Sequence, residues 1–291
     1  MTLVGLPNAG KSTLLNAMIG EKLSIVTPKA QTTWQRVTGI LTERDVQMIF
    51  LDTPGLLEPK DLFQRSMLGA ARVAVEEADV VLLVVDLLHL PDAPATATIR
   101  GALESARAPL LVVLNKVDEA SKEQQSFGRG WAEVLGARVF VISALAGTGI
   151  AELRGALAAA LPEAPFLYPA DEIASEPVRF FVAELVRETV FERYHQEIPY
   201  SVVCHVEEFR EQQDPVYIGI NVFVERESQK GILVGKGGAD VRDLGKAARA
   251  KIEHFLGRSV YLDLWVKTLE GWRKSRGDLT RFGFHIPDDQ R

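Results

Sequence analysis

The octapeptide GLPNAGKS at residues 5–12 decides the fold of this chain. A short β-prone segment, residues 2–4, comes before it, and an apolar helical pattern, residues 13–19, comes after it. This order of strand, loop and helix is typical of a loop that cradles phosphate groups. Taken alone, the pattern also fits a glycine-containing turn that caps a helix, so its interpretation depends on further motifs.

The residue types of this loop suit a bound nucleoside triphosphate. Gly5 and Gly10 let the backbone curl, so that consecutive N–H groups and the start of the next helix point at phosphate oxygens. Lys11 adds a positive charge at the β- and γ-phosphates, and the Ser12 hydroxyl can hold Mg²⁺. The other residues that we expect to contact the nucleotide here are Leu6, Pro7, Asn8, Ala9 and Thr13.

Composition indicates a globular chain of about two domains. The 291 residues are 47% hydrophobic and 25% charged, which excludes a disordered chain. The single cysteine, Cys204, excludes an internal disulfide and favours a reducing cytoplasm. No uninterrupted apolar run reaches the roughly 18 residues that a membrane span needs.

The net charge of −6 argues against indiscriminate binding to nucleic acids. The charge is unevenly distributed in the second half of the chain. Residues 177–229 hold five basic and ten acidic side chains, a net of −5, whereas residues 230–281 hold twelve and six, a net of +6. We therefore expect a basic face late in the chain.

The first half alternates apolar strands with amphipathic helices. After residues 2–4 and 13–19, the predicted strands are 37–43, 46–53, 80–86, 110–114 and 138–142, and the predicted helices are 61–78, 95–107, 122–135 and 150–160. This alternation predicts an α/β domain with a mostly parallel sheet covered on both faces. Ligands bind such sheets at the carboxyl ends of the strands. We assign residues 1–162 to this domain.

The second half has a different pattern. Residues 163–177 are proline-rich with little periodicity, which indicates a linker. Beyond it we predict helix 178–194, strands 200–206 and 216–224, a short helix or strand 231–234, helix 239–256, strand 259–266 and a helical segment 271–282. This order predicts an α+β domain over residues 178–285 and a C-terminal tail, residues 286–291.

A second motif, DTPG at residues 52–55, follows a predicted strand. It suits the sensing of a γ-phosphate, because Asp52 can hold Mg²⁺ through water and the Gly55 N–H can approach with no Cβ in the way. Thr53 and Pro54 complete the loop that we expect at the nucleotide. In isolation, the same four residues also fit an ordinary β-turn.

A third motif, NKVD at residues 115–118, suits a guanine base. The Asp118 carboxylate can accept the two N–H donors of guanine, and Asn115 can bond the other edge of the purine. The aliphatic stem of Lys116 can pack on the ring. A fourth motif follows the next strand and comprises Ser143, Ala144 and Leu145, of which the Ala144 N–H would lie near the guanine O6.

The four motifs GxxxxGKS, DxxG, NKxD and SAL occur in an order that resembles the translation-factor-like GTPase family. By that resemblance the loop with Thr32 and Thr33 is the first switch, and Thr33 is the preferred Mg²⁺ ligand, with Thr32 the alternative. The resemblance thus implies Mg²⁺ ligands Ser12, Thr33 and Asp52, and a catalytic set of Lys11, Thr33, Asp52 and Gly55.

Leu56 departs from the Ras-type pattern, which has a water-orienting glutamine after this motif. A leucine cannot orient water, so we expect slow intrinsic hydrolysis. Catalysis must then recruit a backbone group, a partner, or a monovalent cation such as K⁺ held near Asn8.

The second domain contains a glycine-rich loop before a basic helix. The loop comprises Gly235, Lys236, Gly237 and Gly238, and the helix carries Arg242 and Lys246. The element order αββααβ with this loop between two helices resembles a type II K-homology (KH) domain, whose glycine loop clamps the backbone of single-stranded RNA. A helix that ends on glycine is the alternative.

Both halves together resemble the Era family of bacterial GTPases along essentially the whole chain. The resemblance also rests on KAQTT at 29–33, YSVVCHVEEF at 200–209 and LVGKGGADVRDLG at 233–245. It implies a GTP- and GDP-bound assembly factor that contacts the 3′ region of 16S rRNA, the 30S subunit and, peripherally, the inner face of the cell membrane. We expect a monomer. Trp34 stands where arginine is common, which leaves the contacts of that position open.

Two rival functions stay open on sequence grounds. The first is an RNA-binding module in which GTP is a structural ligand and its hydrolysis is incidental. The second is a P-loop ATPase or nucleotide kinase, which NKVD disfavours.

Overall fold

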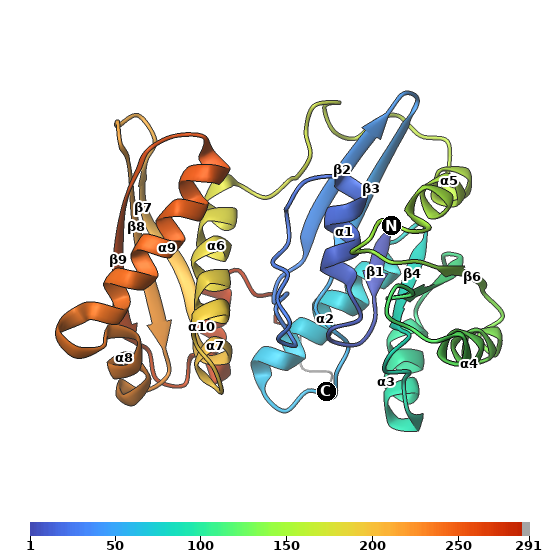
Figure 1. Cartoon of the computed structure of the whole chain (residues 1–291), viewed down its shortest axis with the longest axis horizontal. Coiled ribbons are helices and arrows are strands. Elements are labelled where there is room, and N and C mark those ends of the chain that lie inside the picture. The colour runs from blue at the N-terminus through green and yellow to red at the C-terminus, as the bar shows by residue number, and fades with distance from the viewer. Residues whose placement is uncertain (287–291) are drawn as a thin grey trace. The chain divides into compact units, whose positions relative to one another are not determined.

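The computed structural model describes residues 1–286, and its contacts divide the chain into two units (Figure 1). Unit 1 comprises residues 1–175 and the segment that begins at Phe284, and unit 2 comprises residues 176–283. The contacts thus divide the chain after residues 175 and 283, whereas the sequence-based assignment placed boundaries after residues 162, 177 and 285. Of the expected tail, 286–291, all but Ile286 lies outside the described residues.

Unit 1 is an α/β domain, which confirms the predicted fold class. Its strands are β1 (Thr2–Val4), β2 (Val37–Glu43), β3 (Val46–Asp52), β4 (Val81–Asp86), β5 (Leu110–Asn115) and β6 (Arg138–Val141). Its helices are α1 (Lys11–Ile19), α2 (Leu62–Glu76), α3 (Ala93–Leu103), α4 (Lys122–Glu133) and α5 (Ile150–Ala160). The strand order is β2-β3-β1-β4-β5-β6, with a β2–β3 hairpin and parallel pairing between all other neighbours.

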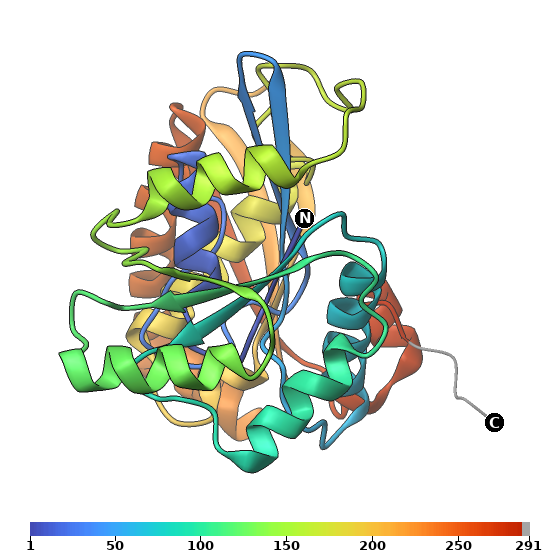
Figure 2. The same ribbon diagram turned by 90° about the vertical axis from the view of Figure 1, so that its right-hand side faces the viewer.

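Helices cover both faces of this sheet. α1 packs beside α5 on one face, whereas buried residues of α2, α3 and α4 share one apolar core on the other. Figure 2 shows α1 on the opposite side of the sheet from α2 and α3. All residues of β4 are buried, as the apolar run at 81–85 predicts for a central parallel strand. The carboxyl ends of β1, β3, β4 and β5 therefore meet at one edge.

The predicted linker, residues 163–177, is ordered along the hairpin of unit 1 up to residue 175. The Gln47 side chain donates to the Tyr168 carbonyl at 2.9 Å. The Ile40 N–H donates to the Ile173 carbonyl at 2.8 Å, and Gly39 forms a β-bridge with Ala174. The prolines and the weak periodicity of this segment argue against a helix or strand, but they do not prevent the segment from packing on the hairpin. The sequence therefore did not reveal these contacts.

Unit 2 has the predicted element order with one short helix added. Its helices are α6 (Val178–Arg193), α7 (Ile198–Ser201), α8 (Glu227–Val234), α9 (Ala239–Leu256) and α10 (Arg276–Arg281), with 3₁₀ turns η1 (Lys236–Gly238) and η2 (Trp272–Lys274). Its strands are β7 (Val203–Arg210), β8 (Val216–Val224) and β9 (Val260–Thr268). β7 and β8 are antiparallel, and β8 and β9 are parallel.

The core of unit 2 lies between its sheet and helices α6 and α9. Apolar residues of β8 meet the buried faces of both helices. Several predicted boundaries differ from the structure, and two of these differences have a local physical cause. The strand predicted from Tyr200 begins at Val203, because Pro199 favours the helical turn α7. The last helical segment breaks at Ser275, whose hydroxyl caps α10 by accepting from the Asp278 N–H at 3.2 Å.

Within residues 1–286, none of the helices combines the length and apolarity needed to cross a bilayer.

Candidate functional site

The GLPNAGKS loop lies at the carboxyl end of the central strand β1. β1 ends at Val4 and α1 begins at Lys11, with Gly10 at a left-handed φ of 93° as the cap of the helix. No side chain caps α1. The N–H groups of its first turn are therefore available to an anionic ligand.

Lys11 is buried inside this loop. Its ammonium donates to the carbonyls of Gly5 at 3.1 Å and Leu6 at 3.0 Å. Burial lowers the pKa of Lys11 to about 8, although the charge of Asp52 opposes the shift. The structure thus holds a poorly solvated cation at the start of α1, where a phosphate would stabilise it.

Three oxygen-bearing side chains meet beside the loop. The Ser12 hydroxyl donates to Asp52 Oδ2 at 2.6 Å and lies 2.8 Å from the Thr33 hydroxyl, which itself donates to Asp52 Oδ2 at 3.3 Å. Burial raises the pKa of Asp52, while the Lys11 charge and the hydroxyl hydrogen bonds lower it. Two hydroxyls and a carboxylate fit the hard oxygen ligands that Mg²⁺ prefers. Thr33, the preferred of the two threonines, is the one in this cluster.

The DTPG loop approaches the phosphate loop closely. A Cβ added at Gly55 would lie 2.8 Å from the Pro7 nitrogen, so only glycine fits there. The Thr53 hydroxyl ties the loop to the Leu3 carbonyl at 2.7 Å. Leu56 donates its N–H to the Gly5 carbonyl at 2.9 Å, and its side chain is fully buried in the apolar core. Leu56 is therefore an anchor of this loop rather than a contact of the cleft.

The loop between α1 and β2, which contains Pro28, Thr32 and Thr33, contacts the phosphate loop through Asn8. The Asn8 amide donates to the Pro28 carbonyl at 3.3 Å. Trp34, whose contacts the sequence left open, is only 4% exposed. Its ring packs edge-on against Phe63 of α2 at 4.9 Å, and Phe63 packs in the same way against Phe284 at 5.1 Å. An arginine would be costly in this apolar setting.

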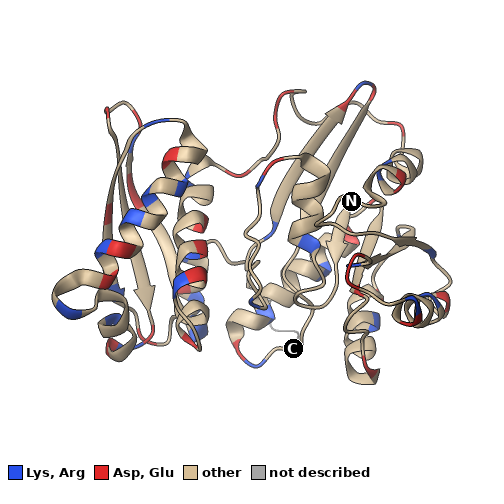
Figure 3. Cartoon of the chain, viewed as in Figure 1, with Lys and Arg blue, Asp and Glu red and all other residues tan. Residues whose placement is uncertain are grey.

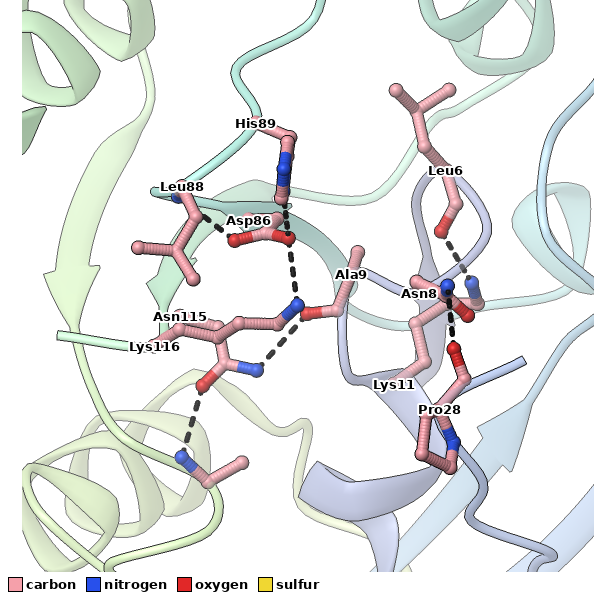
Figure 4. A network of polar contacts seen from close by, with 11 residues as sticks. Leu6, Asn8, Ala9, Lys11, Pro28, Asp86, Leu88, His89, Asn115 and Lys116 are labelled. Atoms are coloured by element: carbon pink, nitrogen blue, oxygen red, sulfur yellow. Dashed lines mark hydrogen bonds and ion pairs between the residues drawn. The ribbon is translucent and has the colours of Figure 1, made fainter. Parts of the chain in front are cut away.

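The NKVD loop follows β5 and is braced on both sides (Figure 4). The Asn115 amide donates to the Ala9 carbonyl at 3.0 Å, and its oxygen accepts from the Ala144 N–H at 2.9 Å. Asn115 thereby joins the phosphate loop to the SAL loop. The Lys116 ammonium lies 2.7 Å from the Asp86 carboxylate.

One predicted role differs from this geometry. We expected the Ala144 N–H to face the guanine O6, but it donates to Asn115. The Asn115 side chain is 2% exposed, so its amide oxygen requires a partner inside the protein. Ser143 and Leu145 border the cleft on either side of Ala144.

All four motifs border one cleft of about 560 Å³. The predicted contacts that line it are Pro7, Asn8, Gly10, Lys11, Ser12, Thr13, Thr33, Gly55, Asn115, Lys116, Asp118, Ser143 and Leu145. The remaining ones lie in the same loops behind this lining and are Gly5, Leu6, Ala9, Asp52, Thr53, Pro54 and Ala144. Sequence reasoning missed Asp86, which also lines the cleft. Its signal was a carboxylate at the end of the apolar strand VVLLVVD.

The GKGG loop of unit 2 joins α8 to α9. Gly235, Gly237 and Gly238 have φ values of 68°, 60° and 77°, a left-handed backbone that favours glycine. Arg242 and Lys246 are exposed on α9. Figure 3 shows acidic residues interspersed with these basic ones along α9, so this part of the late face is mixed in charge.

Two family profiles match the two units. A profile described as a 50S ribosome-binding GTPase matches residues 1–116, and a KH domain profile matches residues 197–273. With the cleft described above, the chain is thus a P-loop GTPase joined to a KH domain.

Relatives cover almost the whole chain. GTPase Era of Carboxydothermus hydrogenoformans is 40% identical over 98% of this chain and 96% of the relative, and that of Nitratidesulfovibrio vulgaris is 40% identical over 97% and 95%. Aquifex aeolicus Era with one substitution, bound to GDP and AlF₄⁻, superimposes with a TM-score of 0.91 at 35% identity, covering 98% of both chains. An Era complex with MgGDPNP and nucleotides 1506–1542 of 16S ribosomal RNA gives 0.92 at 35% identity and the same coverage. The chain belongs to the Era family of GTPases.

Proposed function

We propose that this GTPase binds GTP and Mg²⁺ in the cleft of unit 1, and that its nucleotide state controls the binding of the 3′ region of 16S rRNA by unit 2. The observation that carries the proposal is the meeting of Ser12, Thr33 and Asp52 beside Lys11, in the cleft that NKVD also borders. One end of this cleft suits a metal-bound triphosphate and the other suits guanine.

The chain's own residues divide the work of binding. The loop N–H groups and Lys11 would neutralise phosphate charge, and Ser12, Thr33 and Asp52 would hold Mg²⁺, which would draw charge from the phosphate oxygens. The exposed Asp118 carboxylate accepts the two guanine donors. Adenine lacks this pair of donors, which excludes the ATPase alternative from the proposal.

Intrinsic hydrolysis is expected to be slow. Leu56 is buried and carries no polar group, so it cannot orient the attacking water. Asn8 belongs to the phosphate loop, and its amide donates to the Pro28 carbonyl. We propose that its amide oxygen helps to hold K⁺ there. Replacing K⁺ by Na⁺ should then slow hydrolysis, and this sensitivity should be lost in Asn8→Ala. Equal rates in both salts would remove K⁺ from the mechanism.

The GKGG loop is the proposed RNA clamp. Its left-handed glycines bring bare backbone to the surface beside Arg242 and Lys246, so phosphates of a single strand could approach without meeting a Cβ. The Era structure in complex with a fragment of 16S ribosomal RNA supports the choice of ligand. We extend the proposal to the 30S subunit, a role in small-subunit assembly, a monomeric state and peripheral contact with the inner face of the cell membrane. Sedimentation and liposome flotation test the last two.

Crosslinking to a 16S rRNA 3′ fragment tests the central proposal. We expect crosslinks at residues 235–246 that differ between the GTP- and GDP-loaded protein. Lys11→Ala should abolish this difference and multiple-turnover hydrolysis. Crosslinks independent of the nucleotide, without turnover in the presence of small subunits, would favour an RNA-binding module in which GTP is a structural ligand.

A further inference from the structure

Asp86 lies at the base end of the cleft without belonging to any of the four motifs. It is the last residue of β4 and pairs in register with Asn115, the first residue of NKVD. The two parallel strands thus deliver Asp86 and the base-reading loop to the same edge of the sheet. Asp86 is 7% exposed.

The protein backbone holds the Asp86 carboxylate in place. Its Oδ1 accepts from the Leu88 N–H at 2.8 Å, and the turn that follows is fastened by the Leu87 N–H on the Asn115 carbonyl at 3.1 Å. Its Oδ2 faces outward, accepts a hydrogen bond from Lys116 Nζ at 2.7 Å and lies 3.1 Å from His89 Nδ1 (Figure 4). Burial opposes ionisation of this group, but these hydrogen bonds prevail and lower the pKa of Asp86.

Lys116 depends on such support. Its φ of 68° is in the left-handed region, which is unfavourable for a lysine. Its side chain is 28% exposed and is anchored at the ammonium end by Asp86. Because that carboxylate balances the charge locally, Lys116 offers the ligand its aliphatic stem rather than a free cation.

We propose that Asp86 is a positioning residue of the guanine site, which holds Lys116 extended so that its stem forms one wall for the purine. This inference rests on the proposed function, since it takes NKVD as the base site. Asp86 acts through Lys116 and touches neither the phosphates nor the reacting atoms.

A double-mutant cycle separates positioning from a structural role. Asp86→Asn keeps the volume and an oxygen for the Leu88 N–H but removes the negative charge. Lys116→Met keeps an apolar stem and removes the ammonium. We expect Asp86→Asn to weaken GDP binding about tenfold in the otherwise unchanged protein, as for the loss of one charge-assisted hydrogen bond, and less than twofold in the Lys116→Met background.

Pyrophosphate supplies the second readout, because it occupies the phosphate loop and has no base. Its affinity should be the same in Asp86→Asn and the unchanged protein. His89→Ala, which removes the other partner of the same oxygen from a side chain that is 82% exposed, is the matched control and should change GDP affinity less than twofold. Thermal unfolding confirms that each variant is folded.

Three results overturn the inference: unchanged GDP affinity in Asp86→Asn, equal losses in both Lys116 backgrounds, or a parallel loss of pyrophosphate affinity. Failure of the proposed function looks different. In that case the unchanged protein itself would not bind GDP, or would not prefer it to ADP.

Discussion

The burial of Lys11 makes a quantitative prediction about nucleotide affinity and pH. Lowering the pKa of this lysine from 10.5 to about 8 means that the protein destabilises its charged form by roughly 3 kcal/mol. A bound phosphate can offset this loss of stabilisation. In the nucleotide-bound protein the lysine stays charged. Binding at a pH near or above 8 must therefore include uptake of a proton, and affinity must fall as the pH rises.

The size of the effect follows from the titration. With a pKa of about 8 in the free protein, the charged fraction of Lys11 falls from about 0.9 at about pH 7 to about 0.24 at about pH 8.5. GDP affinity should therefore drop about fourfold over that range. Calorimetry at about pH 8, in two buffers with different ionisation enthalpies, should show uptake of about half a proton per GDP.

The control variant removes an exposed side chain that lines the same cleft. His89→Ala should keep both the fourfold loss and the proton uptake, because neither depends on that side chain. Constant GDP affinity between about pH 7 and pH 8.5, or GDP binding with no proton uptake, would refute the idea that a poorly solvated Lys11 cation receives the phosphate.

Five substitutions test the remaining assignments. Asp118→Asn should shift preference from guanine to xanthine nucleotides, measured by competition binding; an unchanged preference contradicts the pairing. Gly238→Asp should weaken RNA binding at least tenfold by adding bulk and negative charge at the clamp, with GTP affinity as the control; equal loss of both indicates misfolding. Thr33→Ala should abolish the Mg²⁺ dependence of GTP binding in titrations, whereas a similar loss in Thr32→Ala would reassign the ligand. Phe284→Ala should lower the free energy of unfolding by about 3 kcal/mol in urea, and a change below about 1 kcal/mol would mean that this ring does not anchor the C-terminal segment on unit 1.

Most of the secondary structure was predictable because its signals are local. The apolar runs of β4 and β5 identify buried parallel strands, and the periodicity of residues 239–256 predicted α9 with its observed bounds. Two of the boundary errors arose where a single residue changes the local structure. Pro199 begins a helical turn inside a predicted strand, and Ser275 caps a new helix inside a predicted one.

The sequence also identified the loops of the candidate site, because the chemistry of each motif is contained in three to eight consecutive residues. It could not specify the hydrogen bonds between loops. The Ala144 N–H, expected at the base, instead satisfies the buried amide of Asn115, and that choice depends on two strands that are neighbours only in the folded sheet. Asp86 escaped notice for the same reason.

The sequence by itself determined which segments form strands and helices, the order of the four loops and the residue types available for phosphate, metal and guanine. Those properties depend on neighbours along the chain. Only the tertiary structure decided that Ser12, Thr33 and Asp52 meet, that Asp86 contacts Lys116, and that Trp34 and Phe284 both pack against Phe63. Such contacts join residues far apart in the chain, and their geometry is fixed only once the sheet has formed and its helices have packed against it.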